Sequence, residues 1–310
     1  MRAVTYDHYG DLDDVLRVRE DHPDPKVGPG EALVEVRRAS VNPVDWKIVG
    51  GGLDGMMEAA FPVVPGWDVA GVVRAVGPDT PEFAPGDEVL AYARKDWVHG
   101  GTYAELVTVP VRALAHKPAA LDWDSAGALP LAGQTAYRVL KRLEVGPGDT
   151  VLVHAAAGGV GLLGVQVARE LGARVIGTAS EPNHEHLRSL GVEPVAYGDG
   201  LVERVRALAP DGVDAVADFV GGVLDATLGV LREGGRHASI ADPSVAEHGG
   251  SWVWVRPDGE ELQWLADLAA RGGLTVEVAG RYGLEEVGEA FARSREGHVR
   301  GKLVIHVSDD

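Results

Sequence analysis

The sequence predicts an α/β fold in which an all-β segment is followed by a doubly wound parallel sheet. Residues 1–122 hold short β-type runs separated by proline and glycine, which is the pattern of a compact barrel. From Trp123 onward helical and strand-like runs alternate, which is the order of a doubly wound parallel sheet. The chain is organised around residues 148–178, whose pattern is that of strand, glycine turn, helix and strand.

The all-β segment is divided by turn residues into runs of strand length. Proline and glycine interrupt it at Pro23, Pro25 and 28–30, and further turns are expected at 77–78 and 85–87. The runs that we expect to form strands are residues 2–6, 32–39, 69–76, 88–93 and 103–109.

The later part of the chain predicts two domains and a returning end. Helices are expected at 124–128, 131–143, 161–171, 184–190, 200–208 and 223–231, and strands at 150–156, 173–177, 213–218 and 235–240. The end of the chain, at 274–278, 284–293 and 302–307, regains β character and is expected to fold back onto the first part. We therefore predict one domain at 1–122, completed by 273–310, and a second at 123–272.

The glycine turn has the spacing of a dinucleotide-binding loop. Residues 150–156 form a short apolar run, which favours a buried parallel strand. Gly159, Gly161 and Gly164 then fit G-x-G-x-x-G where a helix opens. In such a loop the first glycine allows a tight turn, the second lets backbone approach a pyrophosphate, and the third lets the helix pack closely. An ordinary glycine-rich loop is the alternative, but the strand–turn–helix–strand context favours nucleotide binding at the helix N-terminus.

Composition indicates a soluble globular protein of about two domains. The chain has 310 residues, of which 45% are hydrophobic and 25% charged. It contains no cysteine, which excludes disulfides and thiolate metal sites and fits a cytoplasmic protein. No apolar run has membrane-spanning length, and the first ten residues lack the order of a signal peptide. The formal charge of −18 argues against a nucleic-acid or anionic-membrane partner.

Several motifs occur in the order in which a known superfamily has them. They are NPVDWK at 42–47, PVVPGWDVAG at 62–71, PGDEV at 85–89, GTYAE at 101–105, LP at 129–130, TAY at 135–137, HAAAGGVG at 154–161, DFVGG at 218–222 and RGK at 300–302. On these motifs the chain resembles the medium-chain dehydrogenases/reductases, and within them the zinc-independent quinone oxidoreductase branch. The resemblance covers nearly the whole length. It implies a GroES-like β-barrel catalytic domain and a Rossmann doubly wound parallel sheet.

The resemblance also implies that no metal is present. Zinc-dependent members hold their catalytic metal with a cysteine, a His-Glu pair and a second cysteine or aspartate. Here Asn42 occupies the region of the first thiolate, and Trp67-Asp68 stands where His-Glu would. His184 and His186 make a poor ligand pair, because residues two apart on a helix face different sides.

The chemistry implied is hydride transfer without a Lewis acid. A quinone, or an alkene conjugated to a carbonyl, accepts hydride and spreads the negative charge onto oxygen. The protein then supplies orientation, apolar walls and a few hydrogen-bond donors. We expect an oxidoreductase of this kind, using NADPH or NADH and a small-molecule substrate. A dedicated biosynthetic enoyl or keto reductase and a non-catalytic NADPH-binding redox sensor remain open alternatives. Loops 50–60 and 242–252 are expected to set the substrate.

Three residues of the first motif are the catalytic candidates. Asn42 and Lys47 lie in the loop that faces the nicotinamide in relatives, and Asn42 is the expected hydrogen-bond donor. Lys47 stands where many quinone reductases have tyrosine, and a surface lysine is the alternative reading. Asp45 is the third candidate, although fixing the loop by hydrogen bonding suits it better than chemistry.

The remaining site residues are implied contacts of the cofactor. They are Thr135, Ala156, Gly158, Gly159, Val160, Gly161, Ser180, Asn183, Val220, Gly221, Ile240 and Lys302. The position that decides between NADH and NADPH, about 20 residues after the first glycine, is the neutral Ala179. This leaves room for a 2′-phosphate with Ser180 as a donor, so NADPH is favoured. Glu181 and the absence of a neighbouring arginine act in the opposite direction.

A homodimer is the expected assembly. Relatives commonly pair the edge strands of their doubly wound sheets, and residues 251–255 are a short aromatic run of the edge type. The alternative is a strand that loops of its own chain cover.

Overall fold

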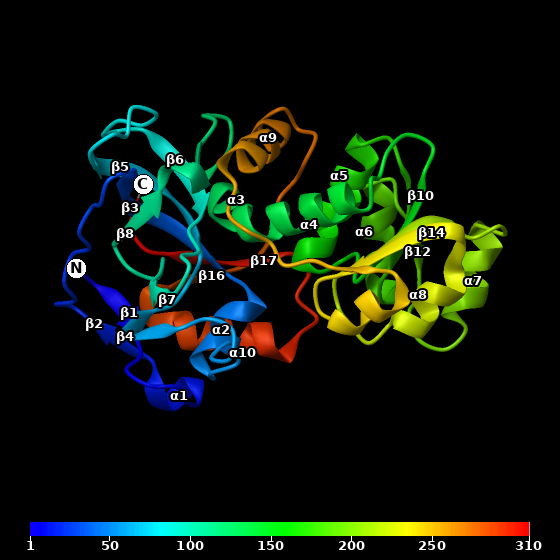
Figure 1. Ribbon diagram of the computed structural model, residues 1–310, viewed down its shortest axis with the longest axis horizontal. Coiled ribbons are helices and arrows are strands. Elements are labelled where there is room, and N and C mark those ends of the chain that lie inside the picture. Colours follow the sequence, from blue (N-terminus) through cyan, green and yellow to red (C-terminus); the bar gives the residue numbers. More distant parts are fainter. Residues whose placement is uncertain (310) are drawn as a thin grey trace. The chain divides into compact units, whose positions relative to one another are not determined.

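The computed structural model describes residues 1–309, and these fall into two compact units. The first unit comprises Met1–Gln134, Arg256–Gly272 and the residues from Val276 on, and the second comprises Thr135–Val255 with Gly273–Thr275. In Figure 1 the second unit has the green to yellow colours. The domain boundaries expected from the sequence, 1–122 with 273–310 and 123–272, stay a prediction.

Strand β3 (Glu31–Val41) is the centre of the first unit. Residues of β3 alternate between buried and half-buried, and Ala32, Val34 and Val36 are fully buried, which is the period of a strand with one face in a core. β3 pairs antiparallel with β5, β8 and β17 in a seven-stranded sheet of order β16-β17-β3-β5-β6-β9, with β8 on β3. The other strands of this sheet are β5 (Asp68–Val76), β6 (Glu88–Tyr92), β8 (Leu106–Pro110), β9 (Leu114–His116), β16 (Val278–Gly283) and β17 (Lys302–His306).

Two small sheets and several helices complete the first unit. β1 (Ala3–Thr5) pairs with β2 (Arg17–Arg19), and β4 (Ala59–Val64) pairs with β7 (Val98–Gly100). The helices are α1 (Leu12–Val15), α2 (Pro43–Val49), α3 (Trp123–Ala128), α9 (Gly259–Ala270) and α10 (Val287–Glu296), with 3₁₀ turns η1 (Val111–Ala113) and η4 (Leu284–Glu286). Helix α4 (Pro130–Arg142) begins in this unit and continues in the second. Among residues 1–309, no helix is long and apolar enough to cross a membrane.

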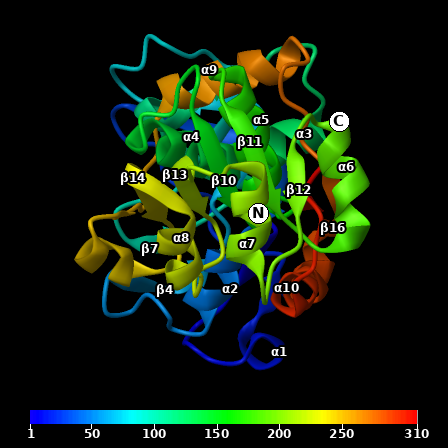
Figure 2. The same cartoon turned by 90° about the vertical axis from the view of Figure 1, so that its right-hand side faces the viewer.

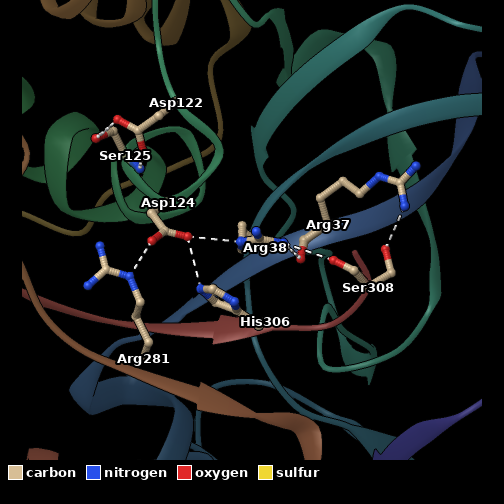
Figure 3. Close-up of polar contacts among 8 residues, drawn as sticks. All are labelled: Arg37, Arg38, Asp122, Asp124, Ser125, Arg281, His306 and Ser308. Carbon is tan, nitrogen blue, oxygen red and sulfur yellow. Dashed lines mark hydrogen bonds and ion pairs between the residues drawn. The ribbon is translucent and has the colours of Figure 1, made fainter. Parts of the chain in front are cut away.

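A cluster around Asp124 ties the two C-terminal strands to β3 (Figure 3). Asp124, in the first turn of α3, accepts hydrogen bonds from Arg38 Nε of β3 at 2.8 Å and from Arg281 Nε of β16 at 2.6 Å. The Nε2 atom of His306, the last residue of β17, lies 3.0 Å from the same carboxylate. Arg38 also donates to the carbonyl of Ser308 at 2.8 Å. The cluster therefore anchors β17, which begins at Lys302.

The second unit is a parallel six-stranded sheet. Its order is β12-β11-β10-β13-β14-β15, and Figure 2 shows its first five strands in this succession. The strands are β10 (Thr150–His154), β11 (Arg174–Thr178), β12 (Glu193–Val195), β13 (Val213–Asp218), β14 (Leu231–Ser239) and β15 (Ser251–Trp252). The connecting helices are α5 (Gly159–Glu170), α6 (His184–Ser189), α7 (Leu201–Leu208) and α8 (Leu224–Val230), with 3₁₀ turns η2 (Glu181–Asn183) and η3 (Pro243–His248). Counted along the chain the strand order is 3-2-1-4-5-6, which is that of a dinucleotide-binding fold.

The strands of the second unit form where the sequence is apolar and short. Val151, Leu152 and Val153 of β10 are fully buried, as expected of a central parallel strand with helices on both faces. The alternation of strands and helices expected from the sequence is confirmed, with element ends shifted by a few residues.

The expected β character of the chain's end is correct in one part and wrong in another. β17 pairs antiparallel with β3, so the expected return to the first part of the chain is observed. Residues 284–293, expected as β, instead belong to η4 and α10. Their apolar positions explain the error, because the buried Val287, Ala290 and Phe291 have the i, i+3, i+4 spacing of a helix. The strand expected at 274–278 lies at Val278–Gly283, where pairing with β17 begins at Val278.

Candidate active site

Six polar side chains of the first unit form one buried cluster, which we call the Asn42 network. Its members are Ser40, Asn42, Asp45, Asp68, Tyr103 and Lys302, and none is more than 5% exposed. The sheet brings them together, because β3 leads into Asn42 while its neighbours β5 and β17 begin at Asp68 and Lys302. A buried polar group is costly unless it is hydrogen-bonded, so the partners of each member decide what the cluster can do.

Asn42 and Asp45 open helix α2. The carboxylate oxygen Oδ2 of Asp45 accepts a hydrogen bond from the Asn42 backbone N–H at 2.8 Å, which is the return arm of a capping box. Pro43 follows as the first helical residue, where its fixed φ and missing N–H suit a helix start. The local sequence Asn-Pro-Val-Asp therefore positions both side chains.

Asp68, at the start of β5, is the most heavily bonded member of the network. Its carboxylate accepts hydrogen bonds from Ser40 Oγ, from Asn42 Nδ2 and from the backbone N–H of Leu131, each at 2.7 Å. Burial raises the pKa of Asp68, while the charge of Lys302 and these hydrogen bonds act to lower it. Three donors and an adjacent ammonium favour the ionised form of this carboxyl.

Lys302 fixes the orientation of the Asn42 amide. Its Nζ donates to the carbonyl oxygen of Val41 at 2.9 Å and to Asn42 Oδ1 at 2.5 Å, and it lies 3.6 Å from Asp68 Oδ2. An ammonium only donates, so the amide oxygen faces Lys302 and the amide nitrogen faces Asp68. One of the two hydrogens on Asn42 Nδ2 is used by Asp68.

Asp45 keeps one oxygen without a partner. Its Oδ2 accepts from the Asn42 backbone N–H and from the hydroxyl of Tyr103 at 2.9 Å. Its Oδ1 is buried and has no hydrogen-bond partner among the described residues. Burial raises the pKa of Asp45 to about 7, although the Asn42 and Tyr103 hydrogen bonds lower it in part.

A small, partly open cleft lies against this side of the network in the first unit. Its lining residues are Asp45, Ile48, Val64, Pro65, Gly66, Trp67, Ala93, Lys95, Trp97, Val98, His99, Gly100 and Gly101. The lining combines aromatic and aliphatic side chains with polar groups. Lys95 Nζ donates to Thr108 Oγ1 at 3.1 Å, and burial lowers the pKa of Lys95.

Lys47, which is also one of the three catalytic candidates, lies outside the Asn42 network. It is exposed on α2, and its Nζ lies 5.5 Å from the centre of the Trp46 ring. Lys302 bridges Asn42 and Asp68 in the network, and its expected contact with the cofactor stays a prediction.

In the second unit, the predicted glycine turn lies between β10 and α5. Gly158 precedes the helix, and Gly159, Val160 and Gly161 form its first turn. A Cβ on Gly161 would lie 2.0 Å from the carbonyl oxygen of Ala155, so no other residue fits there. A Cβ on Gly164 would lie 2.8 Å from the Phe219 ring just after β13, which is the close packing expected of the third glycine.

The other predicted cofactor residues lie at the carboxyl ends of neighbouring strands of this sheet. Ala156 follows β10, and its N–H donates to the carbonyl oxygen of Thr178 at the end of β11. Asn183 Nδ2 donates to Ser180 Oγ at 3.1 Å just after β11.

The turn after β13 is held by a carboxylate. Asp218 Oδ1 accepts from the N–H groups of Val220 and Gly221, each at 2.9 Å, and the N–H of Ile240 donates to the Asp218 carbonyl. Ligands of open parallel sheets bind at this carboxyl edge. Thr135, another predicted cofactor contact, lies on helix α4 and is buried.

Comparison with known proteins agrees with both units. Residues 28–119 match the alcohol dehydrogenase GroES-like domain, and residues 190–305 match the zinc-binding dehydrogenase family. The chain is 34% identical to an NADPH-dependent alkenal/one oxidoreductase of Arabidopsis thaliana, over 99% of this chain and 79% of that protein. The chain belongs to the medium-chain dehydrogenase/reductase superfamily.

Solved structures of this superfamily have the same fold. The quinone oxidoreductase of Coxiella burnetii is 33% identical, with a TM-score of 0.87 and 99% of each chain covered. A mycobacterial protein complexed with NADPH is 32% identical, with a TM-score of 0.84, covering 99% of this chain and 100% of that one. The GroES-like and Rossmann folds implied by the sequence motifs are thereby confirmed.

The zinc that the name of one matched family implies does not suit the residues present. Both oxygens of Asp68 accept hydrogen bonds, and an ammonium lies 3.6 Å from one of them. Asn42 offers only an amide, and its oxygen accepts from Lys302. Residues 1–309 contain no group of three or more His, Cys, Asp or Glu side chains that could hold a metal ion. A catalytic zinc needs three such protein ligands.

The sequence predicted Asn42 and Asp45 as site residues but gave no role to their partners Asp68 and Tyr103. Asp68 and Tyr103 each lie inside a superfamily motif, WDVAG and GTYAE, and that was the available signal. Lys95 and Trp97 of the cleft lie outside these motifs.

Proposed function

We propose that this protein is an NADPH-dependent, zinc-independent reductase of quinones or α,β-unsaturated carbonyls. The observation that carries the proposal is the Asn42 amide, which Lys302 holds with its nitrogen turned away from the ammonium. Among residues 1–309, only one of its two N–H hydrogens is used, in a bond to Asp68 at 2.7 Å. The second is available to an oxygen on which negative charge develops.

The cofactor is assigned to the carboxyl edge of the second unit. The N–H groups of the first turn of α5 suit a pyrophosphate, because the positive end of a helix dipole stabilises anions. Ser180 and Asn183 suit a 2′-phosphate as hydrogen-bond donors, and Ala179 places no charge beside it. When bound, NADPH would supply hydride from its nicotinamide ring. The NADPH-dependent Arabidopsis relative and the mycobacterial protein complexed with NADPH support NADPH as the cofactor.

The residues of the first unit contribute orientation and charge stabilisation. A hydride acceptor conjugated to a carbonyl carries negative charge on oxygen after hydride addition, and an amide N–H fixed in advance stabilises that charge. Removing one such donor lowers rates by about 10²–10³ in other enzymes. Lys47 stays a candidate contact of the bound ligand, since its ammonium is exposed on the same helix.

The proposal includes a homodimer in the cytoplasm. β15 is the last strand of its sheet, and beside it Trp252 and Trp254 are 43% and 36% exposed with ring centres 6.4 Å apart. An exposed aromatic edge supports pairing with a second copy. Sedimentation at micromolar concentration checks this, with a monomer as the contradicting result.

The cysteine-free composition supports the cytoplasmic location.

The proposed function is tested by the loss of NADPH absorbance. Purified protein is assayed with NADPH and NADH in parallel, against 1,4-benzoquinone, 9,10-phenanthrenequinone and 2-cyclohexenone, with and without a zinc chelator. We expect turnover that prefers NADPH and does not change with the chelator. Tight NADPH binding without turnover would instead support the redox sensor, and turnover of one specialised substrate alone would support a dedicated biosynthetic reductase. Loss of turnover with the chelator would contradict zinc independence.

A further inference from the structure

The charges of the Asn42 network balance only when one carboxyl holds a proton. The network contains two carboxyls, Asp45 and Asp68, and one ammonium, Lys302, all at most 5% exposed. Isolated charges in such a place are strongly disfavoured, so a neutral set requires one carboxylic acid. The hydrogen bonds decide which one it is.

The proton belongs to Asp45 on geometric grounds. Asp68 accepts from three donors, whereas Asp45 Oδ1 has no partner in the described part of the chain. The hydroxyl of Tyr103 lies 2.9 Å from Asp45 Oδ2 and 3.1 Å from the carbonyl oxygen of Ser40. A hydroxyl has one hydrogen and cannot donate to both oxygens. The ionised carboxylate accepts from Tyr103, whereas a protonated Asp45 can donate to Tyr103 and leave the Tyr103 hydrogen for the carbonyl oxygen of Ser40. Both contacts of the Tyr103 hydroxyl are then hydrogen bonds.

The titratable and charged groups around Asp45 agree with this assignment. Asp68 of β5 and the tyrosines Tyr6, Tyr92 and Tyr103 lie around it. The charge of Lys302, which is bonded to Asn42 and Val41, acts to lower the pKa of Asp45 but does not outweigh burial. Lys95 and His99 line the same cleft. Burial raises the pKa of Asp45 to about 7, so the acid form is present at neutral pH. An acid of this strength is well matched to proton transfer near pH 7.

Asp45 also lines the cleft. Asp45 is one of its lining residues, together with Trp67 and Trp97. A buried acid beside a cleft with aromatic walls is a setting in which carboxyls serve as proton donors.

We propose that Asp45 is the proton donor that completes the reduction of an α,β-unsaturated carbonyl bound in this cleft. The inference rests on the proposed function. Hydride from the cofactor forms a C–H bond at the β-carbon and leaves an enolate. The O–H bond of Asp45 then breaks as a C–H bond forms at the α-carbon, and water reprotonates the carboxylate. The sum is one hydride and one proton added across the C=C bond.

Quinones provide the internal control. After hydride transfer a quinone becomes a hydroquinone anion, which takes its proton on oxygen directly from water. An enolate needs a proton on carbon, which is slower without a positioned acid. Loss of the acid therefore affects enones far more than quinones.

The experiment compares kcat/KM of wild type and Asp45→Asn for 2-cyclohexenone and for 1,4-benzoquinone. Asparagine keeps an oxygen for the Asn42 N–H but has no acidic proton. We expect kcat/KM for the enone to fall about 100-fold more than that for the quinone, because only the enone needs a proton on carbon. Equal losses for both substrates would overturn the proposal and leave Asp45 as a helix cap. A wild type that reduces neither substrate would instead contradict the proposed function itself.

Two further readouts separate a proton donor from a structural residue. In the wild type the ratio of enone to quinone turnover should fall above pH 7, and in Tyr103→Phe that fall should move to higher pH, because a hydrogen bond to the ionised carboxyl is lost. Infrared difference spectra between pH 6 and pH 9, taken without cofactor, should show a carboxylic acid band that Asp45→Asn lacks. A ratio independent of pH, or identical spectra of the two proteins, would overturn the proposal.

Discussion

The ammonium of Lys302 determines which way the Asn42 amide faces. Nζ lies 2.5 Å from Asn42 Oδ1, and the amide nitrogen on the opposite side lies 2.7 Å from Asp68 Oδ2. Asn42 and Lys302 are 260 residues apart, and the pairing of β17 with β3 brings them together. The C-terminal strand thus contributes directly to the candidate active site.

Replacing the proposed donor should affect chemistry more than cofactor binding. We expect Asn42→Ala to lower kcat/KM about 100-fold, since one fixed donor to the developing oxyanion is lost. The Kd for NADPH, measured by fluorescence titration, should change less than about threefold. Thr80→Ala, which removes another buried hydroxyl of the first unit, is the control and should leave kcat/KM within about twofold. Equal losses in kcat/KM and cofactor affinity would remove Asn42 from the chemistry.

The buried pair of Lys302 and Asp68 should show strong coupling in stability. Lys302→Met leaves Asp68 without a counter-charge, and breaking such pairs lowers the free energy of unfolding by about 3–5 kcal/mol. The double variant Asp68→Asn/Lys302→Met should lose less than the sum of the single variants, as measured by urea unfolding. The exposed pair of Arg174 and Glu193 is the control, because Arg174→Met should cost less than about 1 kcal/mol. Additive losses would show that the two groups act independently.

The glycine at the start of α5 should be irreplaceable for cofactor binding. Gly161→Ala places a Cβ 2.0 Å from the Ala155 carbonyl oxygen, so the turn has to move away from the geometry that suits a pyrophosphate. We expect the Kd for NADPH to rise at least about tenfold. Gly146→Ala, in the same unit but with open space around its Cβ, should leave the Kd unchanged. Wild-type affinity in Gly161→Ala would place the cofactor elsewhere.

Asp45 should make the protein less stable as the pH rises. Its pKa of about 7 in the folded state exceeds its ordinary value of 3.8, so the folded protein binds the proton more tightly than the unfolded chain. The contribution of the protonated Asp45 carboxyl to the free energy of unfolding is therefore lost as the pH rises toward 7. Between pH 5 and pH 8 the free energy of unfolding of the wild type should fall by about 3 kcal/mol relative to Asp45→Asn. A constant difference between the two proteins would contradict the raised pKa.

The contribution of Asp124 to the free energy of unfolding should have the opposite pH dependence. Burial alone would raise the pKa of Asp124, but hydrogen bonds from Arg281 and Arg38 lower it below its ordinary value. Its contribution is thus present at neutral pH and lost as the pH falls through the folded-state pKa. At pH 7, Asp124→Asn should lower the free energy of unfolding by about 1–3 kcal/mol.

Two arginine variants divide that effect. The Arg38 side chain is 9% exposed, so Arg38→Ala should clearly lower the free energy of unfolding. The Arg281 side chain is 58% exposed, so Arg281→Ala should lower it by less than about 1 kcal/mol. Thermal unfolding of both variants measures the two losses of stability. Equal losses would show that the strength of the ion pairs in the cluster does not depend on burial.

The sequence predicted those parts of the fold that local patterns determine. The run from Thr150 to Gly164 encodes strand, turn and helix within 15 consecutive residues, so its spacing was sufficient. The prediction for residues 284–293 was wrong because it followed the β character of the neighbouring segments. The helical spacing of the apolar positions within 284–293 was not taken into account. Strands as short as Val98–Gly100 were missed because three residues carry no periodicity.

The candidate site was predicted only where it is local. Asn42 and Asp45 share one helix start and one motif, whereas Tyr103 lies 58 residues from Asp45 and Lys302 lies 260 residues from Asn42. No spacing rule connects such residues, because strand pairing and burial bring them together. The contact of Lys302 with the Asn42 amide was therefore not predicted, and its expected contact with the cofactor stays a prediction.

The central claim is that hydride goes to the conjugated carbon and not to the carbonyl carbon. The direct test incubates the protein with 2-cyclohexenone and NADPH carrying deuterium at both C4 positions, and locates the label in the product by NMR. The account predicts cyclohexanone with one deuterium on the β-carbon. Deuterium on the carbinol carbon of 2-cyclohexenol, or its absence from every product, would contradict it.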